Sequence, residues 1–380
     1  MLTQFQSYPF QKLSALLDGL DAPQERLHLS IGEPQFPTPQ NILDSLTQNA
    51  NLLNKYPKSS GEDFLRTAQL GFIKKRFALE LESAQIIPTF GTREVLFNFP
   101  QFYLFGKCTP TIAYPNPFYQ IYEGAAIASN ARIVLMELNK QNAFKPALTK
   151  AQLQEVDLVI LNSPNNPTGA TLSIDELAQW VRLAQEYSFV ILSDECYSEI
   201  YAKEPPASIL QACVKVGNHS FEQILALNSI SKRSNAPGLR SGFIAGDAQI
   251  LKAYGLYRTY VGCASPLPLQ KAAAAAWQDF SASEHSRAIY ARNLSLAQEF
   301  FPQAQVAPYS FYLWLEVGED TEFCKYLYTM EGIVVLPGSF LGRNGAGKGF
   351  VRIALVYESA IIKDALKRIK SALARFKDAQ

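Results

Sequence analysis

The sequence predicts an α/β protein in which a large domain, built on a mostly parallel sheet, adjoins a smaller α+β domain. Short apolar runs recur through the middle of the chain, and helical patterns lie between several of them. This alternation is typical of strands that are buried on both faces of a parallel sheet. The length of 380 residues suits two domains better than one. Beyond residue 251 the alternation stops, which indicates a separate unit.

The strands and helices of the large domain follow from these runs. The expected strands are residues 111–114, 132–135, 158–161, 189–192, 224–227 and 242–245. The clearest helix between them covers residues 173–187, where apolar side chains fall on one face. Ser173 and Glu176 have the spacing of a capping box at its start.

The C-terminal part has a different pattern. An alanine-rich stretch at residues 271–277 begins a helical region, and a long helix continues through residues 287–300. The expected strands of the smaller domain are residues 311–317, 333–336 and 350–354, followed by a helix at residues 360–376. We therefore predict an N-terminal arm that forms part of the small domain (residues 1–40), a large domain (residues 41–280) and a small C-terminal domain (residues 281–380).

Charge and hydropathy exclude several classes of partner. The 35 basic and 34 acidic residues leave a formal net charge of +1, and no basic stripe runs along the chain, so nucleic acid is not an expected partner. The chain has neither the pattern of a signal peptide nor an apolar run long enough to span a membrane. We therefore expect a cytoplasmic protein that does not bind membranes.

Cysteine and histidine are poorly placed for metal binding. The five cysteines, Cys108, Cys196, Cys213, Cys263 and Cys324, contain no C-x-x-C pair and are expected to be reduced thiols. Only three histidines occur, and none lies near the motifs described below. No metal site is therefore predicted, and lysine, carboxylate and tyrosine must carry any proton chemistry.

Lys232 is the best candidate for a reactive amine. It comes shortly after the expected strand at residues 224–227, between Ser229 and Ser231 on one side and Arg240 on the other. A nucleophilic amine beside donors that suit a phosphate is what pyridoxal 5′-phosphate requires. The alternative is a solvated lysine in a loop whose Pro-Gly pair only marks a turn.

Two further segments supply other parts of a pyridoxal site. Asp194 follows the strand at residues 189–192, where open α/β sheets bind ligands, and its carboxylate could pair with the ring nitrogen. Tyr197 and Asn166 could donate hydrogen bonds to the phenolic oxygen of the cofactor. The alternatives are a loop or cap aspartate and a plain Asn-Pro-Thr-Gly turn.

These motifs occur together with others along nearly the whole chain. They are Ile31-Gly-Glu-Pro34, Tyr56-Pro-x-x-x-Gly61, Gly91-Thr-Arg-Glu94, Tyr114-Pro-x-Pro-x-Tyr119, Asn166-Pro-Thr-Gly169, Asp194-x-x-Tyr197, Ser229-x-Ser-Lys232, Arg240 and Val351-Arg-Ile353. In this order and spacing the chain resembles the class I/II aminotransferases of pyridoxal-phosphate fold type I. The large domain would then be the cofactor-binding domain.

The resemblance implies a role for each matching residue. Lys232 would hold the cofactor as an internal aldimine and later move the proton at the substrate Cα, in a ping-pong reaction. Asp194 would pair with the ring nitrogen, and Tyr197 and Asn166 with the phenolic oxygen. The remaining cofactor contacts would be Tyr119 on the ring face and, around the phosphate, Gly91, the backbone at Thr92 and Arg93, and the side chains of Ser229, Ser231 and Arg240.

The resemblance also implies substrate contacts and a partner subunit. Arg352 would clamp the substrate α-carboxylate, with Gly32 and Asn166 beside it. Tyr56 would reach the phosphate of a neighbouring subunit, so a homodimer with shared active sites is expected. The alternative for Arg352 is a strand residue that faces water.

The substrate must be inferred from other segments. Tyr8-Pro-Phe10 and residues 231–243, 337–343 and 351–355 resemble bacterial succinyldiaminopimelate aminotransferases of lysine biosynthesis. This resemblance implies amino exchange between glutamate and N-succinyl-2-amino-6-oxopimelate. Arg343 and Lys348 are candidates for its further carboxylates, although either could be a solvated loop charge.

Other reactions stay open on the sequence. The cofactor motifs also suit an aminotransferase of the aspartate or aromatic type and a carbon–sulfur β-lyase. A regulator that binds the cofactor without turnover is the remaining alternative. A near match to a phosphate-binding P-loop at residues 342–349 lacks the Ser or Thr that would bind magnesium, because Gly349 follows Lys348.

Overall fold

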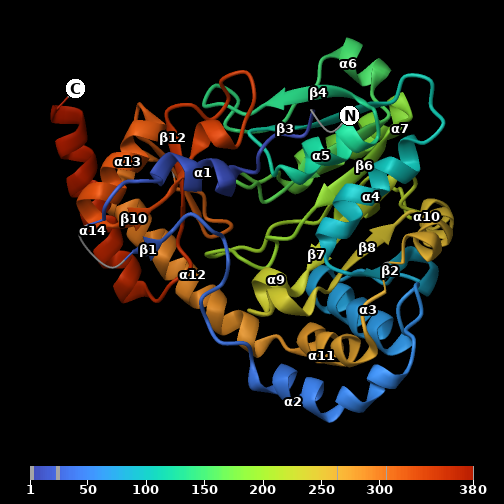
Figure 1. The fold of residues 1–380 in the computed structure, drawn as a ribbon. Helices are drawn as coiled ribbons and strands as arrows, with labels where there is room; N and C mark the ends of the chain where they lie inside the picture. Colours follow the sequence, from blue (N-terminus) through green and yellow to red (C-terminus); the bar gives the residue numbers. More distant parts are fainter. Residues whose placement is uncertain (1–3, 23–25, 263, 305, 380) are drawn as a thin grey trace.

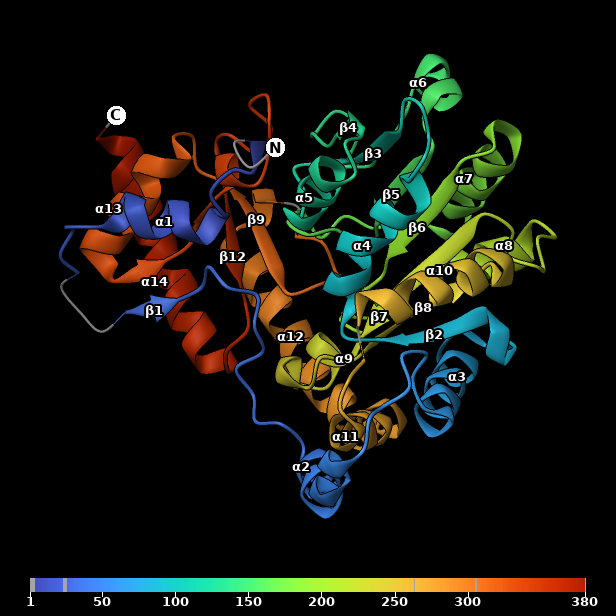
Figure 2. The same cartoon turned by 45° about the vertical axis from the view of Figure 1, so that its right-hand side comes forward.

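The computed structural model describes residues 4–22, 26–262, 264–304 and 306–379. Cys263, one of the predicted free thiols, lies outside the described residues. Two sheets of different size organise these parts of the chain, with a long helix, α12 (Ser281–Phe300), running between them (Figures 1 and 2). None of the described helices is long and apolar enough to cross a membrane.

The larger sheet has seven strands in the order β2-β8-β7-β6-β5-β3-β4. Their bounds are β2 (Ile86–Thr89), β3 (Thr111–Asn116), β4 (Arg132–Glu137), β5 (Leu158–Asn162), β6 (Val190–Asp194), β7 (Ile224–Ser229) and β8 (Gly242–Gly246). Strands β3 to β7 pair in parallel, whereas β8 and β2 pair antiparallel. All six strands predicted for this domain are present. The unpredicted strand, β2, contains Pro88 and lies at the sheet edge, where a missing N–H is tolerated.

Helices cover both faces of this sheet, so its strands are buried on both sides. Ile191 packs into one apolar cluster, and its neighbour Leu192 packs into the other. The first cluster includes side chains of α2 (Gln40–Gln48), α3 (Asp63–Phe77), α7 (Ile174–Tyr187), α8 (Ile209–Lys215) and α11 (Leu267–Gln278). The second includes side chains of α4 (Thr92–Leu104), α5 (Ile121–Ala128) and α10 (Ala248–Val261). The predicted capping box forms, because Ser173 accepts a hydrogen bond from the Glu176 amide.

The second region is built on a three-stranded antiparallel sheet in the order β11-β12-β9. Its elements are β9 (Tyr312–Glu316), α13 (Asp320–Glu331), β10 (Ile333–Val334), β11 (Leu336–Pro337), β12 (Phe350–Ala354) and α14 (Ser359–Asp378). The N-terminal segment joins this region, because β1 (Leu27–His28) pairs with β10 and α1 (Pro9–Leu17) lies beside α13 (Figures 1 and 2). The exact domain limits at residues 40 and 280 stay a prediction.

Short helices complete the chain. They are η2 (Ala50–Asn54), η3 (Ser83–Gln85), α6 (Lys150–Glu155), α9 (Ile230–Arg233), η4 (Pro237–Leu239), η5 (Pro302–Ala304) and η6 (Gly338–Phe340). Of these, α9 matters most for the site, because it begins where the central strand β7 ends. It therefore holds its side chains at the carboxyl edge of the parallel strands, where α/β sheets bind ligands.

Candidate active site

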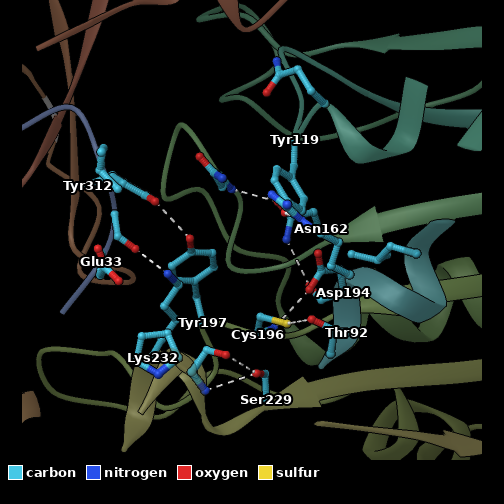
Figure 3. A pocket seen from close by; sticks show the side chains of 18 of the residues that line it. Glu33, Thr92, Tyr119, Asn162, Asp194, Cys196, Tyr197, Ser229, Lys232 and Tyr312 are labelled. Carbon is cyan, nitrogen blue, oxygen red and sulfur yellow. Dashed lines mark hydrogen bonds between the residues drawn. The ribbon is translucent and has the colours of Figure 1, made fainter. Parts of the chain in front are cut away.

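A pocket of about 450 Å³ lies at the carboxyl ends of the central strands. Asn162, Asp194 and Ser229, the last residues of β5, β6 and β7, all line it. The N-terminal segment and the second region close it from the other side (Figure 3). The predicted site residues that line this pocket are Gly32, Thr92, Arg93, Tyr119, Asn166, Asp194, Tyr197, Ser229, Ser231, Lys232, Arg240 and Arg352. Gly91 and Tyr56 are not among the lining residues.

Lys232 projects from α9 into this pocket. Ser229 caps the helix by accepting a hydrogen bond from the Ser231 amide at 3.1 Å. The Lys232 Nζ donates a hydrogen bond to the Gly32 carbonyl. Desolvation of the amine lowers the pKa of Lys232 to about 8, and the positive charge of Arg352 contributes to this shift. A larger fraction of the amine is therefore neutral, and thus nucleophilic, than for an ordinary lysine.

Asp194 is buried at the end of β6, with its carboxylate facing the same pocket. One oxygen accepts a hydrogen bond from the Tyr122 hydroxyl at 2.7 Å, and the other from the Cys196 amide at 3.2 Å. Burial raises the pKa of Asp194, whereas these hydrogen bonds oppose that effect. No ion pair to a cation is found for Asp194 within the described parts of the chain. A cationic ring nitrogen would supply the missing charge.

Tyr197 and Asn166 face the pocket from two loops. The Tyr197 hydroxyl lies 3.0 Å from the hydroxyl of Tyr312 (Figure 3), and burial raises the pKa of Tyr197 well above its usual value. The Asn166 backbone amide donates a hydrogen bond to the Asn162 side-chain oxygen at 2.8 Å. The Asn166 side-chain oxygen accepts from Arg352 at 2.8 Å, so this residue connects the end of β5 to Arg352.

A cradle for a phosphate forms where α4 begins. The helix starts at Thr92 after Gly91, whose φ of 72° places it in a region that favours glycine. A Cβ at Gly91 would collide with the Arg240 guanidinium, so the glycine lets this cation approach the helix start. The hydroxyls of Ser229 and Ser231 lie 3.0 Å apart beside it. Helix amides, hydroxyls and a guanidinium form a donor set suited to a phosphate.

Arg352 lies in the interior of β12 and is buried, rather than facing water. Its guanidinium donates to Asn166 at 2.8 Å and to the Ser30 carbonyl at 2.7 Å. It also lies 4.4 Å from the centre of the Tyr312 ring. An arginine held in this way presents a fixed planar fork to the pocket, which matches a carboxylate.

Arg93 is a third arginine that lines the pocket, besides Arg240 and Arg352. The resemblance to the family implied a role only for the backbone of this residue. The guanidinium donates to the hydroxyls of Tyr119 at 2.9 Å and Tyr8 at 3.1 Å. Among the described residues it forms no ion pair with a carboxylate, unlike Arg76, Arg258 and Arg343. The signal available in the sequence was an arginine in the first turn of the helix that follows Gly91.

The two cations predicted for further carboxylates lie elsewhere. Arg343 forms a two-pronged ion pair with Glu123 of α5, at 2.7 and 2.5 Å, and does not line the pocket. Its backbone also exchanges hydrogen bonds with the Asn116 side chain. Lys348 is exposed in the loop before β12. The expectation that either residue contacts substrate is therefore not supported, since Arg343 instead joins the two regions of the molecule.

Tyr56 lies on the surface of the chain, away from this pocket, and is fully exposed. Its loop is fixed against α10, where Ser59 and Thr259 hydroxyls lie 3.3 Å apart. Large apolar side chains are also exposed on α10 and α4, namely Leu256, Tyr260, Phe97 and Phe105, the last in the residue after α4. A single chain therefore does not bring Tyr56 to its own site.

Comparison with known proteins gives the family. Residues 24–369 match the family described as aminotransferase class I and II. A curated relative, 4-dedimethylamino-4-oxo-anhydrotetracycline transaminase OxyQ of Streptomyces rimosus, is 30% identical over 368 residues, which is 95% of this chain and 96% of that protein. LL-diaminopimelate aminotransferase of Natranaerobius thermophilus is 30% identical over 91% of each chain.

Solved structures agree. The crystal structure of aminotransferase AspB from Helicobacter pylori superimposes with a TM-score of 0.96 at 52% identity, covering 97% of this chain and 98% of that one. An aminotransferase from Neisseria meningitidis gives a TM-score of 0.92 at 40% identity, with the same coverage. The chain belongs to the class I and II aminotransferase family and is a pyridoxal-phosphate-dependent transaminase. The pocket residues fit the cofactor, because the anion cradle, a nucleophilic lysine and an unpaired buried carboxylate converge there.

Proposed function

We propose that the enzyme transaminates amino acids that carry a second acidic group, with Lys232 as the residue that moves the proton at the substrate Cα. When bound, pyridoxal phosphate supplies an electron sink for the charge that develops at this carbon. Asp194 would hold the ring nitrogen in its protonated form, and Tyr197 would donate to the phenolic oxygen. Ser229, Ser231, Arg240 and the first amides of α4 would anchor the phosphate.

Lys232 suits both of its roles. Its pKa of about 8 means that the amine is partly neutral near neutral pH, so that it can accept a proton and return it. The Gly32 carbonyl holds the Nζ by a hydrogen bond, which keeps the amine in the pocket when it is free. The buried Arg352 next to Asn166 would orient the substrate α-carboxylate.

The observation that carries the substrate proposal is that two arginines, besides Arg240 at the proposed phosphate site, line the pocket. Arg352 would take the α-carboxylate, and Arg93 would take the second acidic group. Among the described residues, the Arg93 guanidinium donates hydrogen bonds only to the hydroxyls of Tyr119 and Tyr8 and forms no ion pair, so its charge is available to an anionic ligand. A bidentate guanidinium contact would distinguish a carboxylate from an apolar side chain of equal length.

At a finer level we propose the N-succinyl-LL-2,6-diaminopimelate:2-oxoglutarate reaction of lysine biosynthesis. Several relatives, at 27–30% identity, are named LL-diaminopimelate aminotransferase, which supports a diaminopimelate-type substrate. The two arginines equally support an aspartate-type reaction, which is the second candidate. The sequence motifs shared with succinyldiaminopimelate aminotransferases favour the first.

We also propose that the enzyme is a cytoplasmic homodimer. The fully exposed Tyr56 and the exposed apolar side chains on α10 and α4 support a subunit contact on this face. Tyr56 would then reach the phosphate site of the other subunit. Sedimentation analysis of the wild type and Tyr260→Asp should show a dimer and a weakened dimer, respectively, whereas a wild-type monomer would refute the shared site.

An acceptor panel tests the substrate proposal. Purified enzyme is incubated with glutamate and one oxo acid at a time, and the amino product is identified by mass spectrometry. N-succinyl-2-amino-6-oxopimelate should be aminated most efficiently. Preference for oxaloacetate would select the aspartate-type reaction, and use of LL-diaminopimelate as donor would select the unsuccinylated substrate. Pyruvate release from cystathionine, without transamination, would instead indicate a β-lyase.

A further inference from the structure

Tyr312 occupies a position in the pocket that no sequence motif indicated. It lies on β9, is 3% exposed, and directs its hydroxyl toward Tyr197 (Figure 3). The two hydroxyl oxygens are 3.0 Å apart. The ring of Tyr312 also lies beneath the Arg352 guanidinium, 4.4 Å from its centre. One side chain thus contacts both the proposed phenolic-oxygen donor and the proposed carboxylate clamp.

The strand register explains this double contact. Tyr312 pairs with Ala354 across the β9–β12 ladder, so Arg352, two residues away on the same face, is its diagonal neighbour. The diagonal distance in a sheet is within reach of aromatic and long side chains. The ring can therefore support the guanidinium by a cation–π contact without leaving its place in the sheet.

Gly32 leaves the space that the hydroxyl end of Tyr312 occupies. A Cβ at Gly32 would overlap the Tyr312 hydroxyl, so only glycine lets this hydroxyl reach its present position. The carbonyl of the same glycine accepts the hydrogen bond from Lys232. The backbone at Gly32 therefore holds the free lysine and forms the wall against which Tyr312 packs.

We propose that Tyr312 is a positioning residue for transamination, whose hydroxyl orients the Tyr197 proton toward the cofactor while its ring orients Arg352. The inference rests on the proposed roles of Tyr197 and Arg352. A hydroxyl group has one proton, so Tyr197 can donate to the phenolic oxygen only if it acts as acceptor toward Tyr312. Tyr312 can be that donor, because the only hydrogen bond of its hydroxyl within the described chain is the one to Tyr197.

The surrounding charges are compatible with this chain of hydrogen bonds. Burial raises the pKa of Tyr197, and Tyr312 adds to the effect, whereas Arg352 from β12 opposes it and Cys196 from the same loop adds to it. Tyr197 therefore remains a neutral donor near neutral pH. A donor that itself accepts a hydrogen bond is polarised and binds its acceptor more strongly.

The pH dependence of the cofactor's visible absorption band tests the proposed role of the Tyr312 hydroxyl. Hydrogen bonds to the phenolic oxygen favour its deprotonated form. They therefore lower the midpoint, which is the pH at which the change of the band with pH is half complete. Tyr312→Phe should raise this midpoint by about 0.2–0.5 pH unit, since only the cooperative part of the Tyr197 bond is lost. The glutamate concentration that half-converts the band should change less than about twofold, because the ring beneath Arg352 is retained.

Tyr312→Leu tests whether the Tyr312 ring supports the Arg352 guanidinium. It should raise the midpoint as Tyr312→Phe does, and should also raise the half-converting glutamate concentration by about three- to tenfold, through loss of the cation–π support. Tyr290→Phe is the matched control, because Tyr290 is a buried tyrosine of the same cluster whose hydroxyl has no hydrogen-bond partner among the residues that the structure describes. It should leave both quantities unchanged.

Tyr197→Phe separates this inference from the proposal on which it rests. A raised midpoint in Tyr197→Phe together with an unchanged midpoint in Tyr312→Phe would overturn the inference and leave the proposed function intact. An unchanged midpoint in Tyr197→Phe would overturn the role of Tyr197 and the inference with it. A graded shift, larger for Tyr197→Phe than for Tyr312→Phe, is the result that the structure predicts.

Discussion

The two sides of the pocket are built in different ways. The cofactor side comes from the ends of the parallel strands and the short α9. Asp194 and Ser229 end adjacent strands of one sheet, and Lys232 lies on the helix that directly follows β7. The substrate side is assembled from separate parts of the chain, namely Tyr8 and Gly32 of the N-terminal segment, Arg93 of α4, and Tyr312 and Arg352 of the second region. A fixed cofactor side can support one chemistry, while the assembled side can vary with the substrate.

Replacing Lys232 should have the largest effect on either side. Lys232→Ala removes the residue proposed both to bind the cofactor covalently and to move the proton, so turnover should fall by at least about 10⁴-fold. Turnover is measured with glutamate and the best acceptor of the panel. Lys363→Ala, at an exposed lysine of α14, should keep full activity. Substantial turnover by cofactor-loaded Lys232→Ala would contradict the assignment.

Replacing Arg352 should lower kcat/KM for all amino acid substrates alike, because every one of them carries an α-carboxylate. Arg352→Gln should lower kcat/KM by about 10²–10³-fold for glutamate and for norvaline, the analogue of equal length without the second carboxylate. Steady-state kinetics with both donors provide the comparison. A loss confined to glutamate would mean that Arg352 binds the distal group instead.

Replacing Arg93 should lower kcat/KM for acidic substrates only. Arg93→Leu should lower kcat/KM for glutamate by about 10–100-fold, the value of a charged hydrogen-bonded contact, and leave norvaline nearly unchanged. Arg93→Lys should recover part of the loss. Arg343→Gln is the matched control, since this arginine pairs with Glu123 outside the pocket. If Arg343→Gln changed the preference for glutamate and Arg93→Leu did not, the substrate side would have to be reassigned.

On the cofactor side, the rate of pyridoxal phosphate incorporation should depend on pH. Because the pKa of Lys232 is lowered to about 8, its neutral fraction in the cofactor-free protein rises with pH and levels off above that value. The rate of pyridoxal phosphate incorporation should therefore increase about tenfold from pH 7 to pH 9 and then level off. Stopped-flow absorbance follows this rate. A rate that keeps rising steeply toward pH 10.5 would show an ordinary lysine.

The same contrast explains what could be predicted from the sequence. The cofactor residues follow apolar runs that are recognisable as strands, so Asp194 and Lys232 could be placed at one sheet edge. Tyr312 and Tyr122 could not, because an aromatic residue within a strand or helix has the same pattern whether it fills the core or lines a pocket. The ion pair of Arg343 could not be predicted either, because its partner Glu123 is distant in sequence and only the folded chain brings the two charges together.

The proposal that a Lys232-bound cofactor accepts an amino group from an acidic amino acid is best tested by the absorbance spectrum of the purified enzyme before and after addition of glutamate. We expect a visible band that glutamate converts to a near-ultraviolet band, and that norvaline converts much more slowly. A protein without a visible band after incubation with pyridoxal phosphate, or a band that glutamate leaves unchanged, would contradict it.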